Sequence, residues 1–260
     1  MHSKRLLVAL VVLPLFYLYT MYLPPPFFFM LLLAVAFLAL TEFSAMYRLD
    51  AALKYACLLL GSAIFSVSFF APEYFSDAIM ASAMAIIVLR LLLKKDPASS
   101  LTGLAPAVIG LLYIPGLLAF QGQLRQIGPE WILFLYGTVW TADSAAYYIG
   151  KGIGKRKLYR EVSPNKTVAG AVGSVLGGAA GALALCMLLV PRLEVLPAIF
   201  IGIIVGIISI IGDLVESMFK RDAGVKDSGT IIPGHGGILD KIDGSLFAGP
   251  FLYWIVKGLV

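Results

Sequence analysis

Acidic and basic side chains are concentrated in one stretch of this chain, Ser217 to Asp243, which reads SMFKRDAGVKDSGTIIPGHGGILDKID. Only 13% of the whole chain is charged, so this concentration is unusual for it. Carboxylates are the ligands that hard divalent cations prefer, and glycines beside Lys and Arg allow a backbone to approach and neutralise a phosphate. The stretch therefore predicts a site for metal ions and phosphates. The alternative is an interfacial loop whose charges pair with one another and face water.

The spacing of the polar residues predicts two helix faces that could carry this site. A helix that continues beyond the apolar segment 196–212 would place four polar residues on one face: Asp213, Glu216, Ser217 and Lys220. Asp240 and Asp243 are three residues apart and would share a face of the next helix. Carboxylates at or near a membrane surface are costly to place there and are usually functional. This cost favours the metal site over the interfacial loop.

A second polar segment begins inside another apolar stretch. Asp143 lies within the predicted span 131–150, and a buried Asp there needs a cation or hydrogen-bond donors. The basic segment 151–167 follows it and ends near Lys166. This segment could bind substrate, mark the membrane topology or attract anionic lipid headgroups. The sequence leaves these three possibilities open.

The composition predicts an all-α, polytopic integral membrane protein. The mean hydropathy is +0.93 and 60% of the residues are hydrophobic, which is more apolar surface than one soluble core could bury. A spanning helix needs about 20 mostly apolar residues. About nine segments meet this requirement: 6–23, 27–43, 53–70, 75–93, 101–120, 131–150, 168–190, 196–212 and 245–260. The two cysteines lie within such segments and are expected to be inert packing residues.

The basic residues predict the orientation of these spans. With the N-terminus in the cytoplasm, all but three of the 20 Lys and Arg residues fall on the cytoplasmic side. The three exceptions are Arg125, Arg192 and Lys257. The polar loops 151–167 and 213–244 then face the cytoplasm. We expect residues 1–120 to form a transmembrane scaffold and residues 121–260 to form the catalytic region that contains both loops.

The charged stretch resembles the signature of the phosphatidate cytidylyltransferases, also called CDP-diacylglycerol synthases. The resemblance rests on residues that match without a gap: Ser217, Lys220, Arg221, Lys226, Asp227, His235, Gly236, Gly237, Asp240 and Asp243. A second region of the family is similar around Asp143, Gly150, Lys151 and Ser163 to Thr167. Family members commonly have Arg where this chain has Lys241, which keeps the charge but loses the forked geometry.

The resemblance implies transfer of CMP from CTP to phosphatidic acid, which yields CDP-diacylglycerol and pyrophosphate. It implies an in-line displacement without a covalent intermediate, assisted by Mg²⁺, alone or with a second ion. The implied metal ligands are Asp213, Asp240 and Asp243. Lys226 and Asp227 complete the implied catalytic set. The implied residues for binding substrate and phosphate are Ser217, Lys220, Arg221, His235, Asp143 and Lys166.

The implied partners and location follow from this activity. CTP and phosphatidic acid would be the substrates, the membrane would supply the lipid, and no nucleic acid is expected. The family further implies a homodimer in the cytoplasmic (inner) membrane, with its active site facing the cytoplasm. Two other readings remain, an ion-coupled transporter and a CTP-dependent lipid kinase. Polar residues confined to one half of the chain argue against the transporter, because carriers often have two matching halves.

Overall fold

The structure is a computed structural model that describes residues 13–94, 97–231 and 236–259. Helices dominate these residues: α2 (Pro25–Met46), α3 (Ala51–Phe70), η1 (Pro72–Tyr74), α4 (Phe75–Leu93), α5 (Ser100–Leu111), η2 (Leu112–Gly116), α6 (Leu117–Ile127), α7 (Pro129–Ile153), α8 (Val168–Leu189), α9 (Val195–Asp222) and α10 (Leu239–Leu259). Residues 13–22 are also helical. Two short strands, β1 (Lys157–Tyr159) and β2 (Ser163–Thr167), pair in an antiparallel hairpin between α7 and α8. The prediction of an all-helical architecture is confirmed for these residues apart from the hairpin.

Six helical segments in the described part of the chain are long and apolar enough to cross a membrane. They are Pro25–Met46, Ala51–Phe70, Pro72–Leu93, Ser100–Ile127, Val168–Leu189 and Val195–Asp222. The predicted spans 131–150 and 245–260 correspond to α7 and α10, which are helical but do not belong to these six. The predicted span 6–23 lies partly outside the described residues. The count of nine spans therefore stays a prediction.

Proline and threonine residues account for several helix starts. Proline occupies the first turn of α2 and of α7, where a backbone N–H would have no acceptor within the helix. The Thr167 side chain caps α8 by accepting a hydrogen bond of 3.1 Å from the Gly170 N–H. Pro115 lies inside the π-helical turn η2, which joins α5 to α6 without ending the helical rod.

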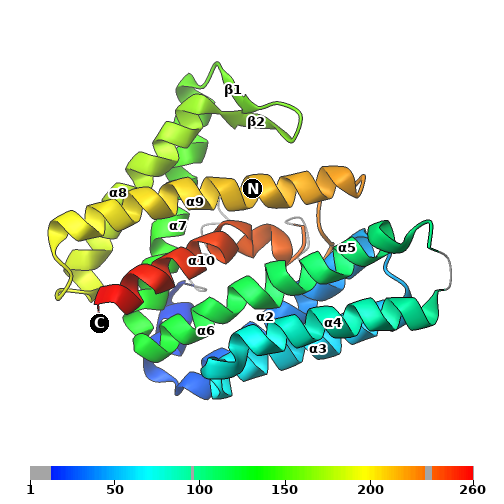
Figure 1. The fold of residues 1–260 in the computed structure, drawn as a ribbon. Helices are drawn as coiled ribbons and strands as arrows, with labels where there is room; N and C mark the ends of the chain where they lie inside the picture. Colours follow the sequence, from blue (N-terminus) through cyan, green and yellow to red (C-terminus); the bar gives the residue numbers. More distant parts are fainter. Residues whose placement is uncertain (1–12, 95–96, 232–235, 260) are drawn as a thin grey trace.

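The helices form one bundle in which α10 joins the two halves of the chain (Figure 1). Helices α2 to α6 pack together, while α10 lies against both α6 and α9. Helices α7 and α8 cross this group and carry the hairpin at their joined ends. A buried polar network ties α6, α7 and α10: the Tyr136 hydroxyl donates to Gln121 Oε1 at 2.7 Å, and Gln121 Nε2 donates to the Ser245 carbonyl at 3.0 Å. The C-terminal helix is thus fixed against α6 and α7.

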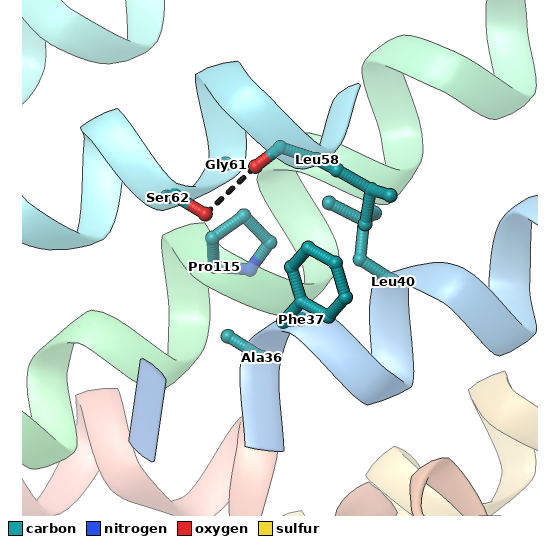
Figure 2. A pocket seen from close by; sticks show the side chains of 7 residues that line it. All are labelled: Ala36, Phe37, Leu40, Leu58, Gly61, Ser62 and Pro115. Atoms are coloured by element: carbon teal, nitrogen blue, oxygen red, sulfur yellow. Dashed lines mark hydrogen bonds between the residues drawn. The ribbon is translucent and has the colours of Figure 1, made fainter. Parts of the chain in front are cut away.

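A narrow apolar crevice lies between α2, α3 and η2 (Figure 2). Its lining consists of Ala36, Phe37, Leu40, Leu58, Gly61, Ser62 and Pro115. The Ser62 hydroxyl is turned back to the Leu58 carbonyl, to which it donates at 2.8 Å. The crevice leaves no room for a water molecule and includes none of the predicted site residues. We therefore regard it as part of the packing of the first half.

Close backbone contact at Gly206 holds α9 against α8. The Ser174 hydroxyl donates to the Gly206 carbonyl at 3.0 Å. A Cβ atom on Gly206 would come within 2.6 Å of the Ser174 carbonyl oxygen, which is backbone and cannot rotate away. Small residues at such crossings allow membrane helices to approach closely. Helix α9 also carries much of the candidate site, so this crossing helps to position it.

We predict that Gly206→Ala lowers the thermal stability of the detergent-solubilised protein. The added methyl group must push α8 and α9 apart, which we expect to cost about 1–3 kcal/mol. Gly152→Ala is the matched control, because a Cβ atom there meets nothing within 4 Å. Thermal unfolding followed by tryptophan fluorescence would show a lower midpoint for Gly206→Ala alone. Equal midpoints for the two variants would contradict the proposed crossing.

Candidate active site

The predicted polar face of α9 is present in the structure. The helix continues past the apolar segment to Asp222, so Asp213, Glu216, Ser217 and Lys220 all lie on it. Glu216 is fully buried and Lys220 is 8% exposed. The Ser217 hydroxyl donates to Asp213 Oδ1 at 3.3 Å. The sequence spacing therefore placed a row of polar groups correctly along one helix.

The start of α10 lies directly beside this row. A Cβ atom on Gly212 would meet the Asp243 carbonyl oxygen at 2.5 Å and the Gly244 Cα at 3.2 Å, so the two backbones nearly touch there. Asp213 is the next residue on α9, and Asp243 is in the second turn of α10. This approach brings carboxylates from two helices together.

Three carboxylates form a cluster that could hold a metal ion. One oxygen from each of Asp213, Glu216 and Asp243 lies within 4.8 Å of the others. Lys220 Nζ forms an ion pair with Glu216 Oε2, whereas Glu216 Oε1 is buried and has no hydrogen-bond donor among the described residues. Hard divalent cations are held by such oxygen ligands together with waters. The three carboxylates and the buried Glu216 Oε1, which has no donor among the described residues, fit a divalent cation.

Asp240 lies next to this cluster but is already surrounded by donors. Lys220 Nζ donates to Asp240 Oδ1 at 2.6 Å, and Oδ2 accepts from the Gly237 N–H at 2.7 Å and the Ser228 N–H at 3.0 Å. Burial alone would raise the pKa of the Asp240 carboxyl, but these hydrogen bonds and the Lys220 charge outweigh burial and hold the pKa at about 2. Asp240 is therefore ionised at neutral pH. The structure groups Glu216, rather than Asp240, with Asp213 and Asp243, and the assignment of Asp240 as a ligand stays a prediction.

The second polar segment reaches the same place. Lys166, on β2, forms an ion pair of 2.6 Å with Asp213. Asp143, on α7, accepts a hydrogen bond of 2.9 Å from the Ser209 hydroxyl, one turn before Asp213. Three separate segments of the C-terminal half, on α7, β2 and α10, thus converge on the polar end of α9. The resemblance had implied that Asp143 and Lys166 belong to the same site as Asp213, and the packing of α7, α8 and α9 brings them together.

The remaining predicted residues lie around the edge or outside the described residues. Arg221 Nε donates to the Val162 carbonyl at 3.3 Å, which ties the hairpin to α9. Lys226 and Asp227 are exposed. His235 lies outside the described residues, so its predicted contact with phosphate has no structural test.

Two residues near the site were not singled out from the sequence. Glu216 was noted on the polar face but was not assigned as a ligand, although its spacing from Asp213 could have indicated it. Glu42 was missed altogether. It is the sole acidic residue in the sequence of α2, and a carboxylate inside a membrane segment is a signal of function that could have identified it.

Comparison with known proteins places this chain among cytidylyltransferases. The model of the "Cytidylyltransferase family" matches residues 3–259. A phosphatidate cytidylyltransferase of Bacillus subtilis (strain 168) is 47% identical over 137 residues, which are 52% of this chain and 50% of that protein. Its counterpart in Synechocystis sp. is 46% identical over 128 residues, 48% of this chain and 42% of that protein. A phosphatidate cytidylyltransferase of Staphylococcus epidermidis (strain ATCC 35984) is 36% identical over 170 residues, 65% of each chain.

The matched part of this chain spans between about two fifths and two thirds of the length of these relatives. The family model, in contrast, covers nearly the whole chain, including both halves of the bundle and every predicted site residue. This chain therefore belongs to the cytidylyltransferase family.

Proposed function

We propose that this protein transfers CMP from CTP to phosphatidic acid and releases pyrophosphate. The observation that carries the proposal is the excess of carboxylates at the polar end of α9. Asp213, Glu216 and Asp243 approach one another, and Lys166 and Lys220 are the described ammonium groups in contact with this cluster. Such an imbalance favours a bound divalent cation with phosphate oxygens as further ligands. The names of the relatives supply the identity of the nucleotide and of the lipid.

In this reaction an oxygen of the phosphatidate phosphate attacks the α-phosphorus of CTP. A new P–O bond forms between the two phosphates, and the bond to the pyrophosphate oxygen breaks. The attacking phosphate is already a nucleophile, so no Ser or Cys nucleophile is required. The task of the protein is to hold two anions in line and to balance the charge that develops on the leaving group.

The residues divide this task between binding a cation and orienting phosphates. Asp213, Glu216 and Asp243 would hold Mg²⁺, which when bound neutralises phosphate oxygens and aligns the two substrates. Lys220 is held between Glu216 and Asp240, so it fixes the arrangement of the carboxylates as well as adding positive charge. Arg221 and Lys226 are exposed near the cluster and would contact the triphosphate, although Arg221 also donates to the Val162 and Val225 carbonyls. These roles follow from position and charge.

The proposed site lies at one end of the bundle, together with most of the basic loops. The Tyr47 hydroxyl, at the end of α2, donates to Asp222 at 3.0 Å, at the end of α9. Lys94, just after α4, pairs with Asp50, just before α3, at 2.6 Å. The positive-inside rule assigns this end to the cytoplasm, where CTP is available. A nine-span topology with a cytoplasmic N-terminus, a scaffold half and a catalytic half, and a homodimer are part of the proposal.

The direct test supplies purified protein in detergent with CTP labelled on its α-phosphate, phosphatidic acid and Mg²⁺. We predict that label enters the lipid fraction, and that chelation of the metal with EDTA stops the reaction reversibly. In a parallel reaction with CTP labelled on its γ-phosphate, label in the lipid fraction would instead identify a lipid kinase. Lack of transfer to any lipid, with folded protein, would refute the proposal.

The two possible roles of Asp240 predict different kinetics. Asp243→Asn should raise the Mg²⁺ concentration for half-maximal rate and lower the rate by about 100-fold or more, because a cluster carboxylate is lost. If Asp240 only anchors Lys220, Asp240→Asn should lower the rate at saturating Mg²⁺ without changing the half-maximal concentration. A raised metal requirement in Asp240→Asn would show that Asp240 is a ligand. Initial rates across a Mg²⁺ titration separate these outcomes.

A further inference from the structure

Glu42 is a buried carboxylate in the half of the chain that was predicted to be scaffold. It lies near the end of α2 and is 5% exposed. Its surroundings are otherwise those of an apolar helix, so its charge needs partners close by. Those partners do not come from α2 itself. They come from the two ends of the segment 228–239, which lies within the charged stretch and leads into α10.

Three donors from this segment converge on the Glu42 carboxylate. The Ile238 N–H donates to Oε1 at 2.9 Å, and the Leu239 N–H donates to Oε2 at 3.0 Å. The Ser228 hydroxyl lies 3.2 Å from Oε2. The two N–H groups stand at the very start of α10, where a helix has no internal acceptors for its first donors. Glu42 therefore caps α10 from a different helix, with a negative charge at its positive end.

The same segment is bound from its other side by Asp240. The Ser228 hydroxyl lies 2.9 Å from Asp240 Oδ2, and that oxygen also accepts from the Ser228 and Gly237 N–H groups. Glu42 and Asp240 thus share the Ser228 hydroxyl and between them satisfy four backbone N–H groups. Both ends of the segment are fixed in this way. A displacement of Glu42 would shift the first turns of α10, which carry Asp240 and Asp243.

We propose that Glu42 is a positioning residue for the carboxylate cluster. It acts through the Ile238 and Leu239 N–H groups and the Ser228 hydroxyl. These contacts hold α10 in the position that brings Asp243 close to Asp213. The catalytic consequence of this role rests on the proposed function. The structural consequence, fixed positions of Ser228, Ile238 and Leu239, is independent of it. The first half of the chain would then take part in building the site as well as in supporting it.

Glu42→Gln is the variant that tests this role. Glutamine keeps the size of the side chain, but its amide group has one acceptor oxygen and turns an NH₂ group toward donors. We expect CMP transfer at limiting Mg²⁺ to fall by about 10–100-fold, with partial recovery at high Mg²⁺, because a residue that supports the cluster has been altered. Thr41→Val is the matched control, since the Thr41 hydroxyl donates only within α2, to the Phe37 carbonyl at 2.8 Å.

Backbone hydrogen exchange, followed by mass spectrometry in detergent, supplies a readout that needs no activity. Glu42→Gln should accelerate exchange in peptides that cover residues 228–243 and leave α3 and α8 unchanged. A general structural role would instead accelerate exchange throughout the bundle. If Glu42→Gln does not fold, Glu42→Asp decides the matter. It keeps the charge but shortens the side chain, which withdraws the carboxylate from the Ile238 and Leu239 N–H groups, and it should accelerate exchange in the same peptides only.

The outcomes separate the two proposals. Unchanged exchange at 228–243, or an unchanged Mg²⁺ requirement in an active Glu42→Gln protein, would overturn the role of Glu42. Uniformly faster exchange would overturn it as well. Lack of CMP transfer by the unsubstituted chain would refute the proposed function, and the exchange comparison would still decide whether Glu42 positions α10.

Discussion

The contact between the polar end of α9 and the start of α10 is the constraint on which the rest of the site depends. It places carboxylates of both helices within a few ångströms of one another in a largely apolar bundle. Lys220 makes this possible by pairing with Glu216 on its own helix and with Asp240 on the other. Buried charges are tolerated only when they are paired and hydrogen-bonded, and removal of one partner is costly. Lys220 is therefore both an electrostatic and a geometric link between the helices.

This constraint explains the organisation of the surrounding elements. Helix α9 must run close to α8 and α10 to bring its polar end into the bundle, and small residues at the crossings allow it. The hairpin contributes Lys166, which pairs with Asp213. Helix α7 contributes Asp143, which binds Ser209 one helical turn before Asp213. Helix α10 is held at its first turn by Glu42 and further along by the Gln121 network. Each element thus fixes one side of the same group of carboxylates.

Much of this arrangement could be predicted from the sequence, because its signals are local. Helical spacing placed Asp213, Glu216 and Lys220 on one face, and hydropathy indicated the apolar helices. The resemblance brought the distant Asp143 and Lys166 into the same predicted site, where the structure also places them. The predicted continuation of this helix beyond the apolar segment 196–212 is also confirmed, since α9 extends to Asp222.

The contacts that could not be predicted are those between segments far apart in the chain. Periodicity gives the face on which Asp240 lies but not that Lys220 and two backbone N–H groups occupy its oxygens. Glu42 is 196 positions away from Ile238 in the chain, and no local pattern pairs them. Such pairings depend on how helices pack, which a single sequence leaves undetermined.

The central claim is that Asp213, Glu216 and Asp243 hold a divalent cation. Anomalous X-ray scattering from crystals soaked in Mn²⁺, which takes oxygen ligands as Mg²⁺ does, tests it most directly. We expect an anomalous peak at bonding distance from these three carboxylates. A peak located elsewhere in the bundle, or none at this cluster in a protein whose activity requires the metal, would contradict the claim.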